Sequence, residues 1–188
     1  MLKTIQEVLR TGNATVKYPF APIVRPEYAR GKPEHDSEKC LACSACAIAC
    51  PPNSIQTVVD ITAGKATWSI NYGRCVYCGH CEEVCPTGAI KLSPEFELAV
   101  MNKDDLEEIC VYSLAACREC GEFFAPTKAV DYAARVLSSQ CDGHGDGGSD
   151  DEETRLAIES ISTCMNCKQK QDAYRYWEKS KQAGELLC

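Results

Sequence analysis

Cysteine dominates the possible chemistry of this chain, with fifteen among its 188 residues. Two segments, Cys40–Pro51 and Cys75–Pro86, repeat one pattern, C-x2-C-x2-C-x3-C-P. Three thiolates two residues apart on a tight loop can face three corners of an iron–sulfur cube, while the fourth is carried away on the next helical turn. The repeat therefore predicts two [4Fe–4S] clusters.

The ligands of the two clusters are expected to cross between the motifs, because the fourth cysteine of such a motif reaches the sister cluster. The first cluster is then held by Cys40, Cys43, Cys46 and Cys85. The second is held by Cys75, Cys78, Cys81 and Cys50. Two zinc sites are the alternative, but zinc knuckles normally present C-x-x-C pairs without a third and fourth member.

The residues around these cysteines are expected to shield and tune the clusters. Small residues between the ligands, such as Ala42 and Gly79, let backbone N–H groups approach sulfur, and such hydrogen bonds help to set the potential. The expected apolar shell comprises Ile48, Ile55, Val58, Trp68, Ile70, Val76, Val84 and Ile90.

A second kind of metal site is predicted in the C-terminal half. Two C-x-x-C knuckles, Cys117 with Cys120 and Cys164 with Cys167, together provide four sulfurs for a tetrahedral site. Zinc is the expected ion, with a single rubredoxin-like iron or a third iron–sulfur cluster that recruits Cys110 as alternatives. The remaining cysteines are expected to be free thiols, with Cys110 buried on a helix and Cys141 and Cys188 exposed.

Composition excludes several other classes of protein. The first twenty residues have no apolar core or cleavage site of a secretory signal, so a reducing compartment is expected and disulfides are disfavoured. No apolar stretch approaches the length needed to cross a bilayer, which predicts a soluble chain. The formal net charge is −7 and no basic stripe is present, which argues against nucleic acid as a partner.

Three regions are expected to position these sites. Residues 1–39 predict an amphipathic helix over 1–11, ended by Gly12, and then an extended docking arm rich in proline over 13–39. The apolar stripe of this helix is expected to pack on its own domain, on a partner protein or at a membrane interface. Residues 40–91 form the 2[4Fe–4S] ferredoxin domain, with a β-hairpin in Ile55–Asn71 turned at Ala63–Gly64.

Residues 92–188 are expected to form a C-terminal extension around the four-cysteine metal site. The sequence predicts a strand near Phe96–Val100, a helix from about Asp104 to Leu114, and a second helix begun by Pro126. A glycine-rich acidic loop over 140–153, a helix over about 152–161 and a polar helical tail follow. The expected fold class is α+β, with a bacterial-type ferredoxin core, an extended N-terminal arm and a helical, metal-binding C-terminal extension.

The motifs taken together resemble one family. GNATVKYPFAP, RGKP, the paired cluster motifs, CPTGAIKLSPEFELAV, CRECGEFFAPTK and a closing CxxCK are similar to the formate hydrogenlyase subunit 6 / hydrogenase-4 component H family, over about residues 1–170. A more distant resemblance is to the two-cluster peripheral-arm subunit of respiratory complex I. His80 departs from the family pattern, where Arg is frequent, and the loop at 141–153 and the tail to Cys188 have no clear counterpart.

This resemblance implies a non-catalytic electron relay in a membrane-bound group 4 [NiFe] hydrogenase. The implied partners are the small and large hydrogenase subunits and, upstream, formate dehydrogenase or another ferredoxin-like subunit. The implied location is the cytoplasmic face of the cell membrane, where separate membrane subunits anchor the complex. The competing hypotheses are a freely diffusing ferredoxin-type carrier and a metal-bearing scaffold subunit of a complex I-like assembly.

Overall fold

The computed structural model of the protein describes residues 2–12, 15–26, 28–141 and 150–185. It contains a two-stranded and a four-stranded β-sheet, and a β-hairpin forms half of the larger one. Strands β2 (Ile55–Asp60) and β3 (Lys65–Asn71) pair antiparallel, as predicted. The turn between them contains Gly64 with φ +66°, and the Asp60 carboxylate accepts the N–H groups of Thr62 and Ala63. The observed strand order in this four-stranded sheet is β2-β3-β5-β6.

Strand β5 (Glu107–Ala116) replaces the helix predicted from about Asp104 to Leu114. Only a 3-10 turn, η2 (Lys103–Leu106), precedes it. The helix prediction was wrong. The burial of side chains along this segment alternates with the period of two that is typical of a strand: Ile109 and Val111 are exposed, whereas Tyr112 and Leu114 are buried. The strand predicted near Phe96–Val100 is also absent, since residues 95–100 have no regular secondary structure.

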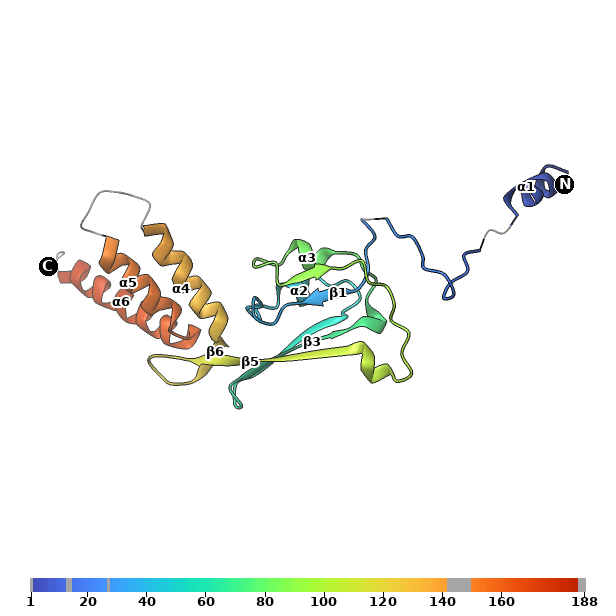
Figure 1. The fold of residues 1–188 in the computed structure, drawn as a ribbon. Helices are drawn as coiled ribbons and strands as arrows, with labels where there is room; N and C mark the ends of the chain where they lie inside the picture. The colour runs from blue at the N-terminus through green and yellow to red at the C-terminus, as the bar shows by residue number, and fades with distance from the viewer. Residues whose placement is uncertain (1, 13–14, 27, 142–149, 186–188) are drawn as a thin grey trace.

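The core lies on one face of this sheet. Ala66, Trp68 and Ile70 of β3 point to that face and are almost completely buried. Their partners on β5 are Tyr112, Cys110 and Glu108 respectively. The cysteine-bearing loops, with α2 (Ala45–Ile48) and α3 (His80–Glu83), lie above the sheet in Figure 1. The sheet therefore provides the floor beneath both cysteine motifs.

A second sheet of two strands ties the N-terminal arm to the core. Strand β1 (Pro33–His35) pairs with β4 (Ile90–Leu92), and Gly31 extends the pairing by donating to the carbonyl of Ser93. The last residues of the arm predicted over 13–39 therefore include a strand that is paired with the core. The earlier arm touches residues 94–97: Tyr18 donates to the Glu97 carboxylate and Arg25 to the carbonyl of Pro94.

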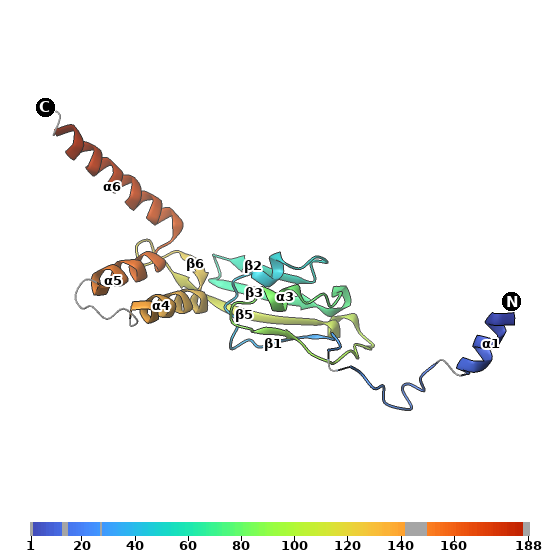
Figure 2. The ribbon, with the colours of Figure 1, turned by 90° about the horizontal axis from the view of Figure 1, so that it is seen from above.

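The N-terminal helix is confirmed and is exposed on every side. Helix α1 (Leu2–Thr11) has no buried residue, and it ends where Gly12 adopts φ +58°. Figures 1 and 2 show it at the far end of the arm, away from the sheet. All of its apolar residues are exposed.

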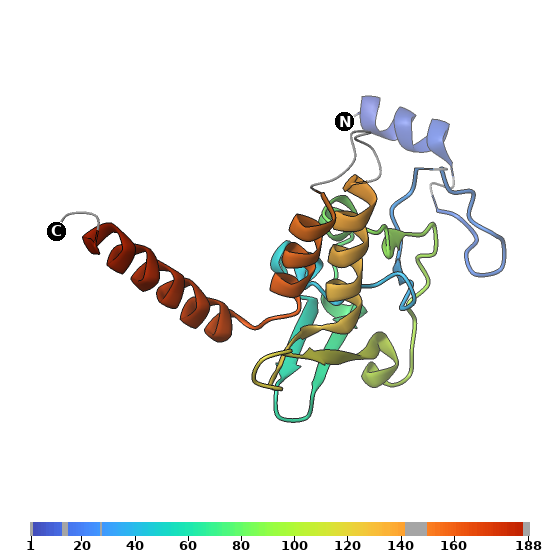
Figure 3. The same ribbon diagram turned by 90° about the vertical axis from the view of Figure 1, so that its left-hand side faces the viewer.

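Three helices form the opposite end of the molecule (Figures 1 and 2). Strand β6 (Phe123–Pro126) leads into α4 (Thr127–Cys141), so Pro126 immediately precedes the helix that it was expected to begin. Helix α5 (Asp150–Ile161) packs beside α4, and α6 (Met165–Glu185) projects away from both (Figure 3). Helices α4 and α5 both extend into the range 140–153 that was predicted to be an acidic loop, since α4 ends at Cys141 and α5 begins at Asp150. The rest of that range, residues 142–149, lies outside the described residues. No described helix is both long and apolar enough to traverse a lipid bilayer.

Candidate metal centres

The two cysteine motifs adopt the same strained backbone. Ala42 and Tyr77 occupy equivalent positions and have φ of 53° and 54°, and the next equivalent pair, Ser44 and Gly79, has φ of 66° and 90°. A residue other than glycine in this left-handed region costs on the order of 1 kcal/mol or more and persists only where the surroundings impose it. Here the strain turns the backbone N–H groups of Ala42 and Tyr77 toward the sulfurs of Cys40 and Cys75, at 3.4 and 3.5 Å.

Two cavities lie between these loops, and each contains cysteines of both motifs. One is lined by Cys40, Cys43, Cys46 and Cys85. The other is lined by Cys75, Cys78, Cys81 and Cys50. Crossed ligation, which was predicted from the spacing of the cysteines, requires the cysteines to be grouped in this way.

The two crossing cysteines receive equivalent hydrogen bonds. The N–H group four residues further along donates to each sulfur: Ser54 to Cys50 at 3.3 Å and Ala89 to Cys85 at 3.2 Å. Burial raises the pKa of the Cys85 thiol, but backbone N–H groups, of which that of Ile90 contributes most, outweigh it and hold the pKa below its usual value. These donors favour the thiolate, which is the form that binds iron.

The net effect is in the opposite direction at two other cysteines of the cavities, Cys46 and Cys81, where burial dominates. Burial raises the pKa of Cys81 to about 11 and also raises that of Cys46. Metal binding must therefore displace protons from these sulfurs, so loading is coupled to proton release. The donor set fits [4Fe–4S] clusters, because its N–H groups would stabilise the negative charge that the thiolates share with such a group.

The cavity of the first motif is also bordered by two stacked rings. Trp68 donates from Nε1 to the sulfur of Cys46 at 3.4 Å. The His35 ring stacks on Trp68 with centroids 3.7 Å apart and an interplanar angle of 16°. His35 also lines this cavity. Sequence reasoning missed it, because a single histidine before the motif carries no spacing signal.

Around the second motif the polar neighbours differ. The guanidinium of Arg30 donates to the carbonyl of Cys78 at 2.9 Å. The Glu82 carboxylate accepts the N–H group of Leu92 at 3.0 Å and so links α3 to β4. The two sites therefore have different electrostatic surroundings although their loops are alike.

Only half of the expected apolar shell is buried. Ile55, Trp68, Ile70 and Ile90 belong to the core. The prediction was wrong for Ile48, Val58 and Val84, which are exposed. Val76 is also exposed, but it lines the cavity of the second motif, as expected. Ile48 is the last residue of α2 and Val84 follows α3, so both lie near the sites at the surface.

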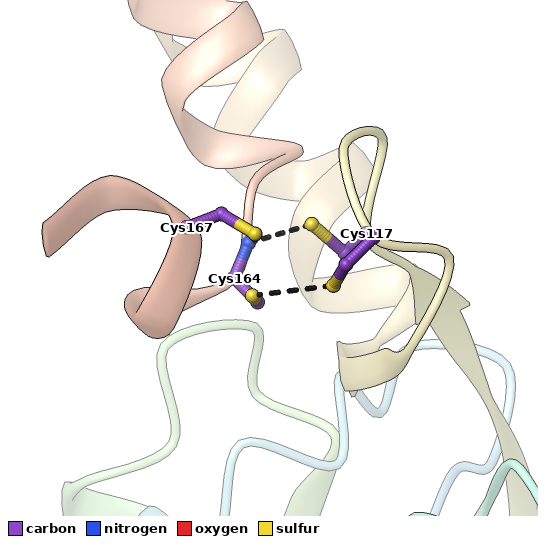
Figure 4. Close-up of side chains that lie close together, drawn as sticks. Cys117, Cys164 and Cys167 are labelled. Carbon is purple, nitrogen blue, oxygen red and sulfur yellow. Dashed lines mark hydrogen bonds between the residues drawn. The ribbon is translucent and has the colours of Figure 1, made fainter. Parts of the chain in front are cut away.

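The C-terminal knuckles converge on one point. The sulfurs of Cys117, Cys120, Cys164 and Cys167 all lie within 4.8 Å of one another. The distance from Cys120 to Cys164 is 3.7 Å, close to the edge of about 3.8 Å in a tetrahedron with metal–sulfur bonds of about 2.3 Å. Figure 4 shows Cys117 facing Cys164 and Cys167 across the gap between the two segments.

Local backbone structure holds this quartet together. Gly121, with φ +75°, donates to the carbonyl of Cys117 at 2.9 Å and closes the first knuckle. Cys164 precedes α6, and Cys167 lies in the first turn of that helix. The N–H group of Cys164 donates to the Cys117 sulfur at 3.2 Å and, with the N–H of Cys120, lowers the Cys117 pKa to about 6. One sulfur of the four is therefore a thiolate at neutral pH.

Cys110 is not the buried helical thiol that the sequence suggested. It lies on β5 opposite Trp68, half-buried. Its sulfur is 3.7 Å from Nδ1 of His35, and with Glu108 these side chains form the second close group of potential ligand atoms among the described residues. The alternative in which Cys110 joins the C-terminal knuckles has no support, since the close group there contains only the four knuckle cysteines.

Comparison with known proteins agrees with this picture. Residues 39–89 match the model of the 4Fe-4S dicluster domain. The chain is 41% identical over 170 residues to formate hydrogenlyase subunit 6 of Escherichia coli, with 90% of this chain and 89% of that protein covered. It is 34% identical to NAD(P)H-quinone oxidoreductase subunit I of Gloeobacter violaceus over 105 residues, covering 52% and 49% of the two chains. A chain of the membrane-bound sulfane sulfur reductase, an archaeal respiratory membrane complex, matches 55% of this chain with 56% of its own length, at 30% identity and TM-score 0.41.

The fold and the two cysteine-lined cavities define a dicluster protein of the 4Fe–4S ferredoxin type, with a further cysteine quartet in its C-terminal region. The level of identity over nine-tenths of both chains is decisive for the family. The chain belongs to the formate hydrogenlyase subunit 6 family.

Proposed function

We propose that this chain is the electron-relay subunit of a membrane-bound group 4 [NiFe] hydrogenase complex. In this proposal electrons cross two [4Fe–4S] clusters on their way from a dehydrogenase module, formate dehydrogenase, to the hydrogenase small subunit. The chain itself catalyses no bond-making step. It supplies the ligands, the hydrogen bonds and the docking surfaces.

The crossed arrangement of the two cavities is the observation that carries the proposal. Each cavity has three cysteines from one motif and one from the other. Each cluster would therefore share protein walls with its neighbour, and the segments Cys46–Cys50 and Cys81–Cys85 would join the two sites. A one-electron carrier with two neighbouring centres suits transfer between two partners better than storage at a single site.

The exposed ends of the molecule favour a subunit over a diffusing carrier. Leu2, Ile5, Val8 and Leu9 form the apolar stripe of α1 and are all exposed. A helix of ten residues has little stability alone and gains it by packing. We infer that α1 and the arm pack on partner subunits, which would hold the chain at the cytoplasmic face of the membrane.

For the cysteine quartet we propose zinc in a structural role. Four sulfurs at tetrahedral spacing with no open position suit a closed zinc site. The ion would connect β5 and β6 to the end of α5 and the start of α6, where Arg118 also pairs with Glu159 at 3.0 Å. The quartet would thus fix the orientation of the helical extension.

The test combines metal analysis of the isolated chain, loaded anaerobically with its clusters, with reduction of the anaerobically purified complex by formate. The proposal predicts about eight cluster irons and one zinc per chain, and two EPR signals that develop on addition of formate. About four irons, or one signal only, would contradict the two-cluster assignment. Signals that dithionite produces and formate does not would contradict the assigned donor.

A further inference from the structure

One buried polar atom near the first cavity has no hydrogen-bond partner among the residues that the structure describes. The His35 side chain is only 2% exposed, and its Nε2 makes no hydrogen bond. A buried N–H without a partner costs roughly 1–3 kcal/mol, so a fold seldom retains one without a reason. Since His35 lines the cavity of Cys40, Cys43, Cys46 and Cys85, the missing partner is to be sought there.

The other ring nitrogen determines whether Nε2 can donate. Nδ1 lies 3.7 Å from the Cys110 sulfur, within hydrogen-bonding range for sulfur, and 3.9 Å from the Glu108 carboxylate, which is too long for a hydrogen bond to oxygen. If the Cys110 thiol donates to Nδ1, the single proton of a neutral imidazole must be on Nε2.

The protonation states favour this tautomer. Burial lowers the pKa of His35, so the ring is neutral near pH 7 although Glu108 and Asp36 oppose the shift. Burial also raises the pKa of Cys110, so the thiol keeps the proton that it donates. Oε2 of Glu108 accepts the Tyr72 hydroxyl at 2.5 Å, and Oε1, the oxygen nearest His35, is 3.9 Å from Nδ1, beyond hydrogen-bonding distance.

A metal ion bound by His35, Glu108 and Cys110 is the competing explanation, since their ligand atoms lie within 4.8 Å of one another. An ion there would bind Nδ1, which already has a partner, and would leave Nε2 unsatisfied. The hydrogen-bond partners of the ring therefore favour a role for Nε2 as a donor toward the cavity over the binding of a metal ion at Nδ1.

We propose that His35 donates a hydrogen bond from Nε2 to a sulfur of the first iron–sulfur cluster, and that Cys110 fixes the tautomer that permits it. This inference rests on the proposed cluster ligation. Trp68 holds the ring in place by stacking and donates its own N–H to Cys46. Hydrogen bonds to cluster sulfurs stabilise the reduced, more negative state and raise the potential. His35 is thus a tuning residue for one cluster of the two.

The test is a redox titration of each cluster by EPR, in the full chain loaded with its clusters. His35→Phe keeps an aromatic ring to stack on Trp68 but removes the donor. We expect the reduction equilibrium constant of the first cluster to fall about tenfold, which is about 59 mV for a one-electron couple. His35→Gln keeps an N–H donor and is expected to restore most of the difference. The second cluster should be unchanged in both variants.

A spectroscopic measurement separates a hydrogen bond from a packing effect. With ¹⁵N-histidine labelling, pulsed EPR of the reduced first cluster should show a nitrogen coupling that His35→Phe abolishes. His80→Phe is the control, because His80 lies between two expected ligands of the other cluster and should leave this coupling intact. Cys110→Ala should weaken the coupling, since the thiol no longer holds the tautomer.

The outcomes that overturn the inference are distinct from failure of the proposed function. An unchanged first-cluster potential in His35→Phe, with both clusters present, would overturn the hydrogen bond and leave the relay intact. Equal shifts of both clusters would point to a general structural effect and would also overturn it. An additional metal ion, beyond the two clusters and the zinc of the quartet, that Glu108→Gln or Cys110→Ala removes would assign the group to that ion. Absence of the first cluster from the unaltered chain would instead refute the proposed function.

Discussion

The backbone N–H group of Cys164 donates a hydrogen bond to the sulfur of Cys117, 3.2 Å away, although the two residues lie 47 positions apart. This bond joins the loop after β5 to the start of α6. It also shows that the two knuckles are ordered relative to each other through backbone as well as through sulfur. The cysteine quartet therefore lies where the loop after β5 meets the start of α6.

The first prediction concerns this connection. In a Cys164→Ser, Cys167→Ser variant we expect loss of zinc and weak assembly with the partner subunits, because metal binding supplies much of the order of such a segment. Both cluster EPR signals should persist, since no cysteine of the cavities is altered. Co-purification of partner subunits and EPR of the isolated chain provide the two measurements.

The matched control for that variant is Cys141→Ser, which leaves unchanged the four cysteines of the quartet and the eight cysteines that line the two cavities. It should retain zinc and assembly. Normal assembly of the double variant with slowed turnover would show that the quartet takes part in electron transfer, and the structural role would have to be abandoned.

Metal binding at the quartet should strengthen as pH rises. The N–H groups of Cys164 and Cys120 lower the pKa of Cys117 to about 6, whereas a hydrogen bond with the Cys164 thiol and burial raise that of Cys167 to about 12. Below about pH 6 a proton competes with the ion at Cys117. Above it, Cys167 must still release its proton to bind, so affinity continues to rise through neutral pH, by up to about tenfold per pH unit for each proton displaced.

Chelator competition at pH 5.5, 7 and 8.5, with zinc-loaded chain, measures this dependence. Proton release on adding zinc to the metal-free chain in weak buffer provides an independent check. An affinity that is flat between pH 5.5 and 8.5 would show that the four sulfurs are already thiolates or do not bind the ion.

Two single variants, Cys50→Ser and Cys85→Ser, test whether the ligation is crossed. Cys50→Ser should chiefly damage the cluster whose other ligands are Cys75, Cys78 and Cys81, although Cys50 belongs to the first motif. Cys85→Ser should damage the opposite cluster. EPR of the two variants, compared side by side, should show the signals lost in reciprocal fashion. If each variant loses the cluster of its own motif, the ligation is local.

The last prediction tests how the arm is tied to the core. A methyl group on Gly31 would overlap the carbonyl of Glu95 and lie 2.8 Å from the carbonyl oxygen of Ser93, closer than real contacts allow. Gly31→Ala should therefore destabilise the chain by about 1–3 kcal/mol and break the pairing beside β1. At Gly73 the nearest atoms are side chains at 3.2 and 3.3 Å, so Gly73→Ala is the milder control. The temperature at which the iron–sulfur absorbance is lost measures both.

The spacing of the cysteines was sufficient to predict the fold class and the meeting of the two C-terminal knuckles in one group. The geometry of metal ligation restricts how far apart ligand cysteines can lie in a sequence, so their spacing carries this information directly. The hairpin was also predictable from alternation in β2 and β3. The segment from Asp104 to Leu114 was misassigned because its leucines and acidic residues favour a helix, and only the paired strand β3 reveals that the period-two face is the buried one. Tertiary context here overrides local propensity.

The His35, Glu108 and Cys110 group could not have been found from spacing. His35 lies more than 70 residues from the other two and meets them only because β1 brings it over the sheet beside Trp68. The exposed Ile48 and Val84 were assigned to the apolar shell of the clusters because they lie close to ligand cysteines in the sequence. An apolar residue next to a ligand cysteine can face the cluster, the core or a partner, and one sequence does not distinguish these.

The proposed exchange of fourth cysteines between the motifs would also limit when the protein can mature. A nascent chain that ends before Cys85 has only three of the four sulfurs of the first cavity, and one that ends before Cys75 has only Cys50 for the second. With crossed ligation, neither cluster could be inserted completely until translation had passed the second motif. In air the same arrangement would spread damage, because oxidation of Cys50 or Cys85 to a sulfinic acid, which is generally irreversible, would also disturb the helix turn that carries a ligand of the neighbouring cluster. Crossed ligation would thereby link the biosynthesis and the oxygen sensitivity of the two clusters.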